Sequence, residues 1–425
     1  LASGASQTGF GRTGTVDWQT GSIKTGTFTA VSGEGYFVNT SGGVSTANLP
    51  AGSAGAIVSF SDYTRTFGTN TLTITPNGSE KIGGVAASIY LSVNGQALTL
   101  VYVDATEGWI NIQNAEDTEE GIVPAFITAT GGTITCSGDY KIHTFTGPGT
   151  FTVCSAGNPL GSSTVEYLVA AGGGGGGSNG GGGGAGGFRF TAPSISPLTY
   201  PAKPLAGPAA LPVSAQGYPI TIGGGGSNTT YGTGTSTSGA NSVFSTITSA
   251  GGGHGGSAPS PFPGAGAGGG SGGGGGGASL AGGPGNSPAV SPSQGNDGGS
   301  SASPNANYGG GGGALAVGTN GVDPSPGGPG GVGGGLPSGF GTSGESSGGY
   351  YYFSGGGGGG TNVSPGGPPG GSGGLGGGGN GSLQEATGEA GTANTGGGGG
   401  GSAGGSSPGS GAGGSGIVII RYKFQ

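Results

Sequence analysis

The chain has 425 residues, of which 121 are glycine, 6% are charged and none is methionine. Its hydrophobic fraction of 30% is well below the roughly 45–50% of an ordinary globular domain, which excludes one large aliphatic core for the whole chain. The net charge of −8 comes without a basic patch, which excludes an ordinary nucleic-acid-binding protein, and no apolar run approaches the roughly 20 residues that span a bilayer.

Residues 1–113 differ from the rest of the chain, because they carry both tryptophans and short segments in which apolar and polar residues alternate. Two such segments, 89–93 and 98–102, flank the dipeptide Asn94-Gly95. Asn-Gly between segments of period two is a strong signal for a β-hairpin. We therefore predict a small all-β module here.

The segment 114–127 contains a short stretch with four acidic residues. A solvated linker is the simplest interpretation of such a stretch. The alternative is a cation site made of Glu116, Asp117, Glu119 and Glu120, but a calcium loop needs a defined ligand spacing that this stretch lacks. We therefore predict an acidic linker.

Apolar strands bracket the glycine-rich part of the chain at both ends. The segment 140–171 contains three predicted strands, and the last of them runs directly into glycine at position 172. A further predicted strand closes the chain at 416–424. A disordered tail does not end in this way, so we predict one closed glycine-rich domain over 128–425.

The two cysteines, Cys136 and Cys154, lie on predicted strands of this domain. A hairpin that turns near 147–149 would place Cys154 opposite a residue near Ile142, and not opposite Cys136. This pairing disfavours a disulfide between them. We expect two free thiols that behave as small buried apolar residues.

The glycine runs have an internal period of three. Pro329 and Val332 keep this spacing in one run, and Pro369, Ser372 and Leu375 keep it in another. Three residues per turn is the period of the polyproline II helix, which makes no hydrogen bonds within itself. Glycine at the remaining positions lets neighbouring helices approach closely enough to bond to one another.

A helix at the surface of such an array tolerates a side chain at every third position, whereas an interior helix must be glycine throughout, as in Gly272–Gly277 and Gly355–Gly360. We take as representative structural glycines Gly174, Gly273, Gly357 and Gly398. Collagen is disfavoured, because it needs one glycine in every three over a long stretch. The predicted fold is an all-β N-terminal module followed by a β-bracketed glycine-rich domain of packed polyglycine/polyproline II helices, with essentially no α-helix.

Aromatic residues in the segments between glycine runs are the candidates for receptor contact. The densest group lies in 336–354 and comprises Phe340, Tyr350, Tyr351, Tyr352 and Phe353. Isolated candidates are Tyr231, Phe262 and Tyr308. Aromatic faces stack on sugars, and tyrosine adds a hydroxyl that can hydrogen bond. The alternative is that these rings cap the end of the glycine array or pack in the fold.

No catalytic set, cofactor motif or metal site is evident. The only histidines, His143 and His254, show no metal-ligand spacing with the two cysteines. Glycine-loop matches arise from composition alone, and no Gly-Lys-Ser/Thr follows one. Glycan cleavage needs paired carboxylates in a cleft, and the glycine-rich part has very few acidic residues. We therefore predict a protein that is not an enzyme and needs no cofactor or nucleic acid.

Four segments resemble the glycine-rich domain of phage tail-fibre proteins: Tyr140–Val153, Val165–Gly177, Asn241–Gly253 and Gly414–Phe424. The likeness covers about residues 130–424, and its specific features are the junctions at which a strand passes directly into glycine. The front part is similar to modules of marine phage fibres over the segments 10–18, 33–38 and 100–109. This resemblance implies that 1–113 is a fibre stem or collar module.

This resemblance implies a host-recognition adhesin of the virion, extracellular and homotrimeric, attached to other phage tail proteins. Its variable loops would contact a bacterial surface glycan or outer-membrane protein. The alternative function is a passive structural fibre or secreted surface component with a stiffening glycine-rich domain. The glycine-rich extracellular domain of the anaplastic lymphoma kinase family shares the strand-then-glycine feature, but the cysteine count and the front module fit that family poorly.

Overall fold

The computed structural model describes residues 16–113, 123–232, 234–258, 264–277, 280–302, 307–322, 326–362, 369–404 and 409–425. The chain forms two compact units, Leu1–Pro124 and Ala125–Gln425, which we call unit 1 and unit 2. Within the described ranges there is no α-helix and no helix that could span a membrane. The helical residues form two short 3-10 turns, η2 (Lys203–Leu205) and η3 (Ser338–Phe340). The predicted all-β class is confirmed, whereas the acidic stretch 114–122 lies outside the described residues.

Unit 1 contains two β-sheets that enclose a common core. One sheet has the order β1 (Asp17–Trp18), β3 (Glu34–Val38), β5 (Ile57–Asp62), β8 (Ala97–Asp104) and β9 (Gly108–Asn111). The other has the order β2 (Thr27–Thr29), β4 (Ser45–Asn48), β6 (Leu72–Thr75) and β7 (Ile89–Leu91). The first six strands alternate between the sheets and pair in parallel within each. Alternate apolar residues such as Phe60 and Ile74 fill the core, as strand periodicity requires.

The prediction of a hairpin at Asn94-Gly95 is wrong, although a turn forms there, with a φ of 82° at Gly95. The flanking strands β7 and β8 belong to different sheets, and β8 pairs with β5 and β9 instead. Leu91 before the turn and Leu98 after it are both buried in the same core. The turn therefore carries the chain across the core from one sheet to the other.

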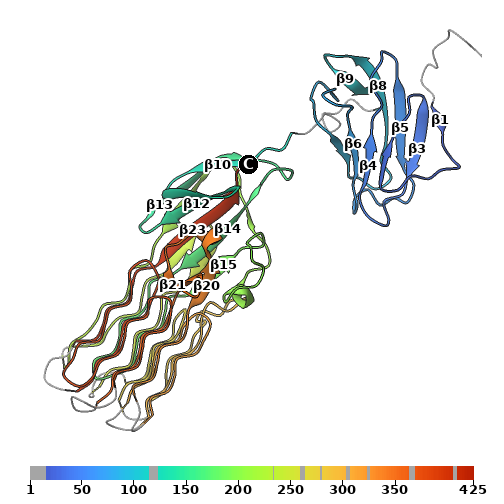
Figure 1. The fold of residues 1–425 in the computed structure, drawn as a ribbon. Coiled ribbons are helices and arrows are strands. Elements are labelled where there is room, and N and C mark those ends of the chain that lie inside the picture. The colour runs from blue at the N-terminus through green and yellow to red at the C-terminus, as the bar shows by residue number, and fades with distance from the viewer. Residues whose placement is uncertain are drawn as a thin grey trace, which may run out of the picture. The chain divides into compact units, whose positions relative to one another are not determined.

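Unit 2 begins and ends in a second pair of packed sheets, which we call the sandwich (Figure 1). One sheet has the order β10 (Ile127–Thr130), β13 (Gly149–Ala156), β17 (Gly217–Thr221), β18 (Ser242–Phe244) and β19 (Ile247–Ser249). The other has the order β11 (Thr133–Ser137), β12 (Tyr140–Phe145), β23 (Ile417–Lys423), β14 (Thr164–Ala170) and β15 (Phe188–Thr191), with β16 (Leu211–Pro212) against β14. The last strand of the chain thus lies between β12 and β14 and closes the unit.

The central strands β14 and β23 are buried on both faces, which explains their unbroken apolar sequence. Val169 and Val418 belong to the core between the two sheets. Leu168 and Ile419 belong to a second core on the other face. A small third sheet contributes to this second core and has the order β20 (Gly334–Pro337), β22 (Tyr350–Phe353) and β21 (Glu345–Ser347).

The hairpin predicted between β12 and β13 is also wrong, because β12 pairs with β11 and β23 while β13 pairs with β10 and β17. Cys136 and Cys154 therefore lie in different sheets. Both are free cysteines, as expected, but both are exposed, which corrects the expectation of burial. Cys136 lies on the edge strand β11, most of whose residues face solvent.

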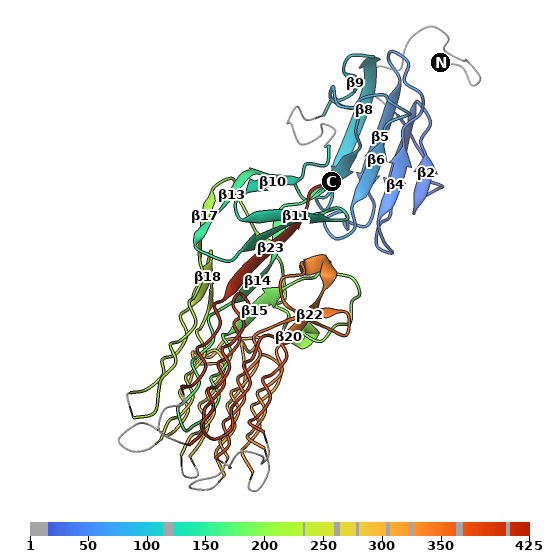
Figure 2. The ribbon, with the colours of Figure 1, turned by 60° about the vertical axis from the view of Figure 1, so that its left-hand side comes forward.

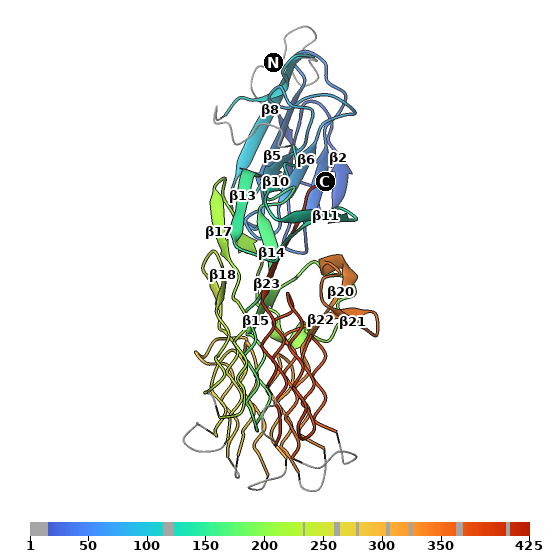
Figure 3. The same ribbon diagram turned by 90° about the vertical axis from the view of Figure 1, so that its left-hand side faces the viewer.

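The glycine runs extend from the sandwich as extended helices that lie side by side (Figures 2 and 3). The run 180–187 shows the three-residue register directly, because every third N–H group donates to the same neighbour. The N–H groups of residues 180, 183 and 186 donate to the carbonyl oxygens of residues 402, 399 and 396 in one run. Those of residues 181, 184 and 187 donate to residues 256, 253 and 250 in a second run, and those of residues 182 and 185 donate to residues 309 and 312 in a third. This is the hydrogen-bond pattern expected of packed helices with three residues per turn.

Run 180–187 is surrounded by glycine backbone. Three further runs donate N–H groups to its carbonyl oxygens: 172–177, 271–277 and 354–361. With the three acceptor runs it therefore has six hydrogen-bonded neighbours. Ordering a residue costs roughly 1–2 kcal/mol of backbone entropy, and a backbone hydrogen bond returns about 1 kcal/mol. Such an array is marginal alone, so its attachment to sandwich strands at the ends of the runs adds needed stability.

Side chains and glycines occupy the positions that a packed array requires. Pro329 and Val332, spaced by three, both face solvent. In contrast, Gly272–Gly277 and Gly355–Gly360 are buried throughout, as predicted. A Cβ atom at a representative interior glycine would overlap a backbone carbonyl group of another run; the pairs are Gly174 with Gly253, Gly273 with His254, Gly357 with Gly399, and Gly398 with Gly183.

One buried histidine links β12 to β23. The Nδ1 atom of His143 lies 2.7 Å from the Gly131 carbonyl oxygen, and its Nε2 atom lies 3.1 Å from the Tyr422 hydroxyl oxygen. Burial lowers the pKa of His143, so the ring is neutral, donates from Nδ1 and accepts at Nε2.

This histidine should make unit 2 less stable in acid. Below a pH of about 6.5 the unfolded chain takes up a proton that the folded chain does not, so stability falls by up to about 1.4 kcal/mol per pH unit. His143→Gln should remove this part of the pH dependence. Thermal unfolding of the parent protein and of His143→Gln, from neutral to mildly acidic pH, measures this dependence. If the unfolding midpoints of the two proteins fall equally with pH, His143 is not the source of the acid sensitivity.

Candidate functional site

The glycine runs have a free end opposite the sandwich, which we call the distal end (Figure 3). The chain enters unit 2 at Ala125, which exchanges hydrogen bonds with Asn158 beside the sandwich. Its last strand, β23, begins where a glycine run enters the sandwich and ends on the side remote from the runs. The start of unit 2 and the end of β23 thus both lie away from the distal end. The described turns of the distal end include Asn179, Tyr231 and Glu385.

Asn179 connects three separate turns at the distal end. It adopts a φ of 50°, a left-handed conformation that asparagine tolerates better than most residues. Its Oδ1 atom accepts hydrogen bonds from the Tyr308 hydroxyl at 2.9 Å and the Gly404 N–H at 2.8 Å. Burial raises the pKa of Tyr308 to about 12, which keeps this hydroxyl protonated as a donor.

Two further buried connections brace the same end. Thr229 and Ser410 are joined by backbone and side-chain hydrogen bonds between their turns. Asn307 donates from Nδ2 to the Val322 carbonyl at 2.6 Å and accepts a hydrogen bond from the Thr361 hydroxyl. Segments that are far apart in the sequence are therefore held in fixed positions.

The side chains exposed on this braced end are mixed in character. Tyr231 is 37% exposed, Leu280 39% and Val322 53%. The polar residues Asn228, Thr230, Glu385 and Thr387 are exposed as well. Thr230, which precedes Tyr231, forms an isolated β-bridge with Gly409. Gln384, which precedes Glu385, forms another with Ala403. The end thus presents an aromatic ring, small apolar groups and hydroxyls on a fixed base.

The isolated aromatic candidates have different environments. Tyr231 lies at the distal end and is exposed. Tyr308 lies at the same end but is only 1% exposed, because it braces Asn179; the expectation of receptor contact does not hold for it. Phe262 lies outside the described residues.

The aromatic group of 336–354 lies against the sandwich, away from the distal end. Phe340 and Phe353 are each 1% exposed in the second core of unit 2, which corrects the expectation that they contact a receptor. Tyr350, Tyr351 and Tyr352 are half-buried, and Tyr352 packs over Gly335. These rings cover an apolar sheet face, so the density of aromatic residues in the sequence identified the cluster but not the end of the unit on which it lies.

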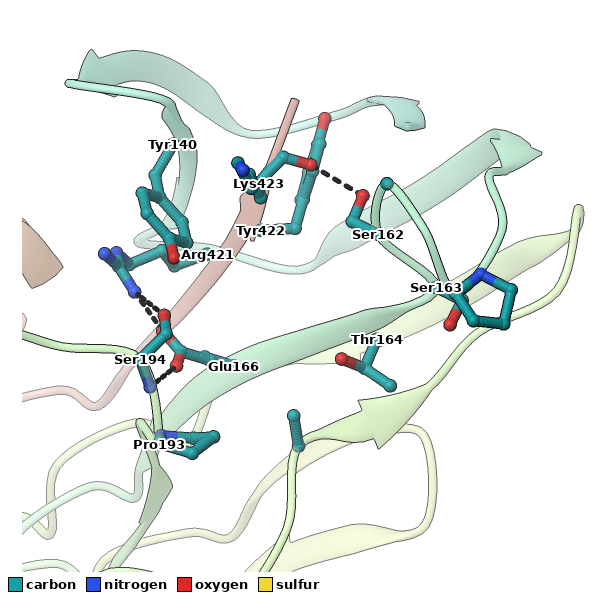
Figure 4. Close-up of a pocket in the computed structure, with 13 residues that line it drawn as sticks. Tyr140, Ser162, Ser163, Thr164, Glu166, Pro193, Ser194, Arg421, Tyr422 and Lys423 are labelled. Atoms are coloured by element: carbon teal, nitrogen blue, oxygen red, sulfur yellow. Dashed lines mark hydrogen bonds and ion pairs between the residues drawn. The ribbon is translucent and has the colours of Figure 1, made fainter. Parts of the chain in front are cut away.

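A cavity of about 250 Å³ opens beside the ends of β14 and β23 (Figure 4). Glu166 and Arg421 form a buried ion pair in its wall. The Glu166 carboxylate also accepts a hydrogen bond from the Ser194 N–H at 2.6 Å, and Arg421 donates to the Ser194 hydroxyl at 2.9 Å. The ring of Tyr140 lies 3.5 Å from the guanidinium carbon of Arg421. Sequence reasoning missed this cavity, because Glu166 and the two cations Arg421 and Lys423 are far apart in the chain.

The lining of this cavity contains one carboxylate. Glu166 is the carboxylate of the lining, and it is held by Arg421, so the cavity wall does not supply the two carboxylates that glycoside hydrolysis requires. Among the residues that the structure describes, no group of three or more His, Cys, Asp or Glu side chains could hold a metal ion.

Comparison with known proteins bears on unit 2. The family model of a glycine-rich domain matches residues 144–423. This match spans the sandwich strands from β13 to β23 and the glycine runs between them. Comparison with curated proteins gives no match.

Proposed function

The chain belongs to the family of the glycine-rich domain, and on this premise we propose that it is the receptor-binding protein of a phage tail fibre. Its distal end binds a glycan or an outer-membrane protein on the bacterial surface. Unit 1 serves as stem or collar in an extracellular, homotrimeric fibre that is joined to the other tail proteins of the virion. The strand-to-glycine junctions at Val165–Gly177 and Gly414–Phe424 are the residues on which the phage resemblance rests.

The braced distal end is the observation that carries this proposal. Its turns are held by hydrogen bonds that Asn179 accepts and that Thr229 and Asn307 donate. The runs beneath these turns are bonded to one another along their length. A surface that is ordered before binding loses less entropy when the receptor docks. Connecting segments on a rigid scaffold are the usual place for recognition.

The exposed groups favour a receptor with hydroxyls and apolar faces over a highly charged polymer. Tyr231 offers a ring for stacking and a hydroxyl for hydrogen bonding. Leu280 and Val322 add exposed apolar area to the same end, where Thr230 and Thr387 are exposed as well. Pyranose rings and surface loops of membrane proteins both have this mixed character.

Adsorption to bacteria tests the proposal. A panel of strains is screened with labelled full-length protein, and Tyr231→Ala and Glu385→Lys are then compared on a strain that binds. Each should weaken binding by about tenfold or more, as expected for side chains at a recognition centre, while the unfolding midpoint stays unchanged.

Val332→Ala is the matched control, because Val332 is exposed on the side of a glycine run. It should adsorb like the parent protein. If a double variant that carries both Tyr231→Ala and Glu385→Lys adsorbs as well as the control, the distal end is not the receptor face. A passive structural fibre would then be the better explanation.

A further inference from the structure

The cavity beside β14 and β23 lies at the sandwich end of unit 2 and is independent of the distal end (Figure 4). We propose that this cavity binds an acidic saccharide residue, meaning a sugar ring that carries one carboxylate. The inference rests on its charge, on its unpartnered hydroxyl groups and on its aromatic wall, and each is argued in turn.

The lining has an excess of positive charge. It contains the cations Arg421 and Lys423 and the anion Glu166, and the ion pair between Arg421 and Glu166 leaves Lys423 uncompensated. The described part of the chain gives Lys423 no ion-pair partner; its ammonium lies 5.7 Å from the ring centre of Phe126. A local excess of cations in a chain of net charge −8 favours a ligand with one negative group.

Several hydroxyl groups of the lining have no partner within the described residues. These belong to Tyr140, Ser163 and Thr164, whereas the Ser162 hydroxyl donates to the Lys423 carbonyl at 2.7 Å. Figure 4 places Ser163 and Thr164 across the cavity from Tyr140 and Tyr422. Hydroxyls both donate and accept, so they match the alternating needs of the hydroxyls on a sugar ring.

The guanidinium group is fixed in the cavity wall. Arg421 is 5% exposed, and its guanidinium group is held by the Glu166 carboxylate and the Ser194 hydroxyl. Tyr140 packs on this guanidinium and forms an aromatic wall of the cavity. The cavity thus combines cationic groups, an aromatic wall and free hydroxyls. This combination fits a carboxylated sugar better than a bare inorganic anion, which would use the charge alone.

Ligand-observed NMR on the full-length protein tests this site, with sodium glucuronate as the probe. Glucose serves as the neutral comparison and inorganic phosphate as the comparison without a sugar ring. Glucuronate should bind saturably, and both comparison ligands should bind at least tenfold more weakly. Lys423→Gln and Thr164→Val should each weaken glucuronate binding, the former by about tenfold, which corresponds to about 1.4 kcal/mol.

Lys203→Gln is the matched control, because the Lys203 ammonium lies over the Tyr200 ring and outside the cavity lining. It should bind glucuronate like the parent protein, and so should Tyr231→Ala, which alters only the distal end. Absence of saturable glucuronate binding overturns the proposal. Phosphate binding as tight as that of glucuronate, or full binding by Lys423→Gln, also overturns it.

Discussion

Gly357→Val should abolish folding of the glycine-rich unit. The N–H of Gly357 donates to the Gly183 carbonyl, and its own carbonyl accepts from the Gly311 N–H. A Cβ atom at this position would overlap the Gly399 carbonyl. The overlapped group is backbone and cannot rotate away, so the runs must separate and lose several hydrogen bonds at once. Domains have only about 5–15 kcal/mol of net stability, and this disruption should exceed what unit 2 can lose.

Val332→Ala is the control for this substitution, because Val332 lies in a glycine run but faces solvent. Its effect on the free energy of unfolding should stay within about 0.5 kcal/mol. Yield of folded full-length protein and thermal unfolding distinguish the two variants. Equal tolerance of both substitutions would show that the runs are not packed backbone to backbone.

Glu166→Gln should destabilise unit 2 by about 3–5 kcal/mol, the usual result of removing one partner from a buried ion pair. The substitution removes the charge that compensates Arg421, which is 5% exposed. It also weakens the acceptor for the Ser194 N–H, so the loop beside β15 loses its attachment. Chemical denaturation of the full chain measures the change.

A double variant distinguishes the effect of losing one partner of the ion pair from the effect of losing both. Glu166→Leu combined with Arg421→Met replaces the ion pair by apolar side chains, and such replacements are often close to neutral. The double variant should therefore be more stable than Glu166→Gln alone. If the double variant were the less stable of the two, the ion pair would not be the source of the loss.

The geometry of the glycine runs could be predicted because a three-residue period has few structural solutions. Side chains at Pro329 and Val332 mark the outward positions, and glycine elsewhere permits close approach. The strands at 140–145 and 417–423 could also be recognised, because their apolar residues are bounded by turn residues or glycine. Local pattern was sufficient for these features.

The lateral order of the runs could not be predicted, because glycine has no side chain to specify a neighbour. Nothing local to Gly183 indicates that it bonds to Gly399 and Gly357. The same limit explains the wrong hairpin at Asn94-Gly95, where the turn signal was real but the sheet partner was decided by the shared core. It also explains the burial of Phe340 and Phe353, since the end of the unit on which a segment lies depends on run direction.

The cavity at the sandwich end shows the same limit at a candidate site. Glu166 and Arg421 come from β14 and from β23, and their ion pair forms only after β23 closes the sheet. Asn179 is similar, because its partners Tyr308 and Gly404 belong to other turns. Sites built from such long-range contacts leave no local signal in the sequence.

Amide hydrogen exchange tests the packed-backbone account most directly. Each N–H of run 180–187 is bonded to another run, so it can exchange only when the runs separate. Peptides covering 180–187 and 354–361 should therefore retain their protons as long as peptides from β23 do. Exchange at the rate of an unstructured glycine peptide, while β23 stays protected, would contradict the account.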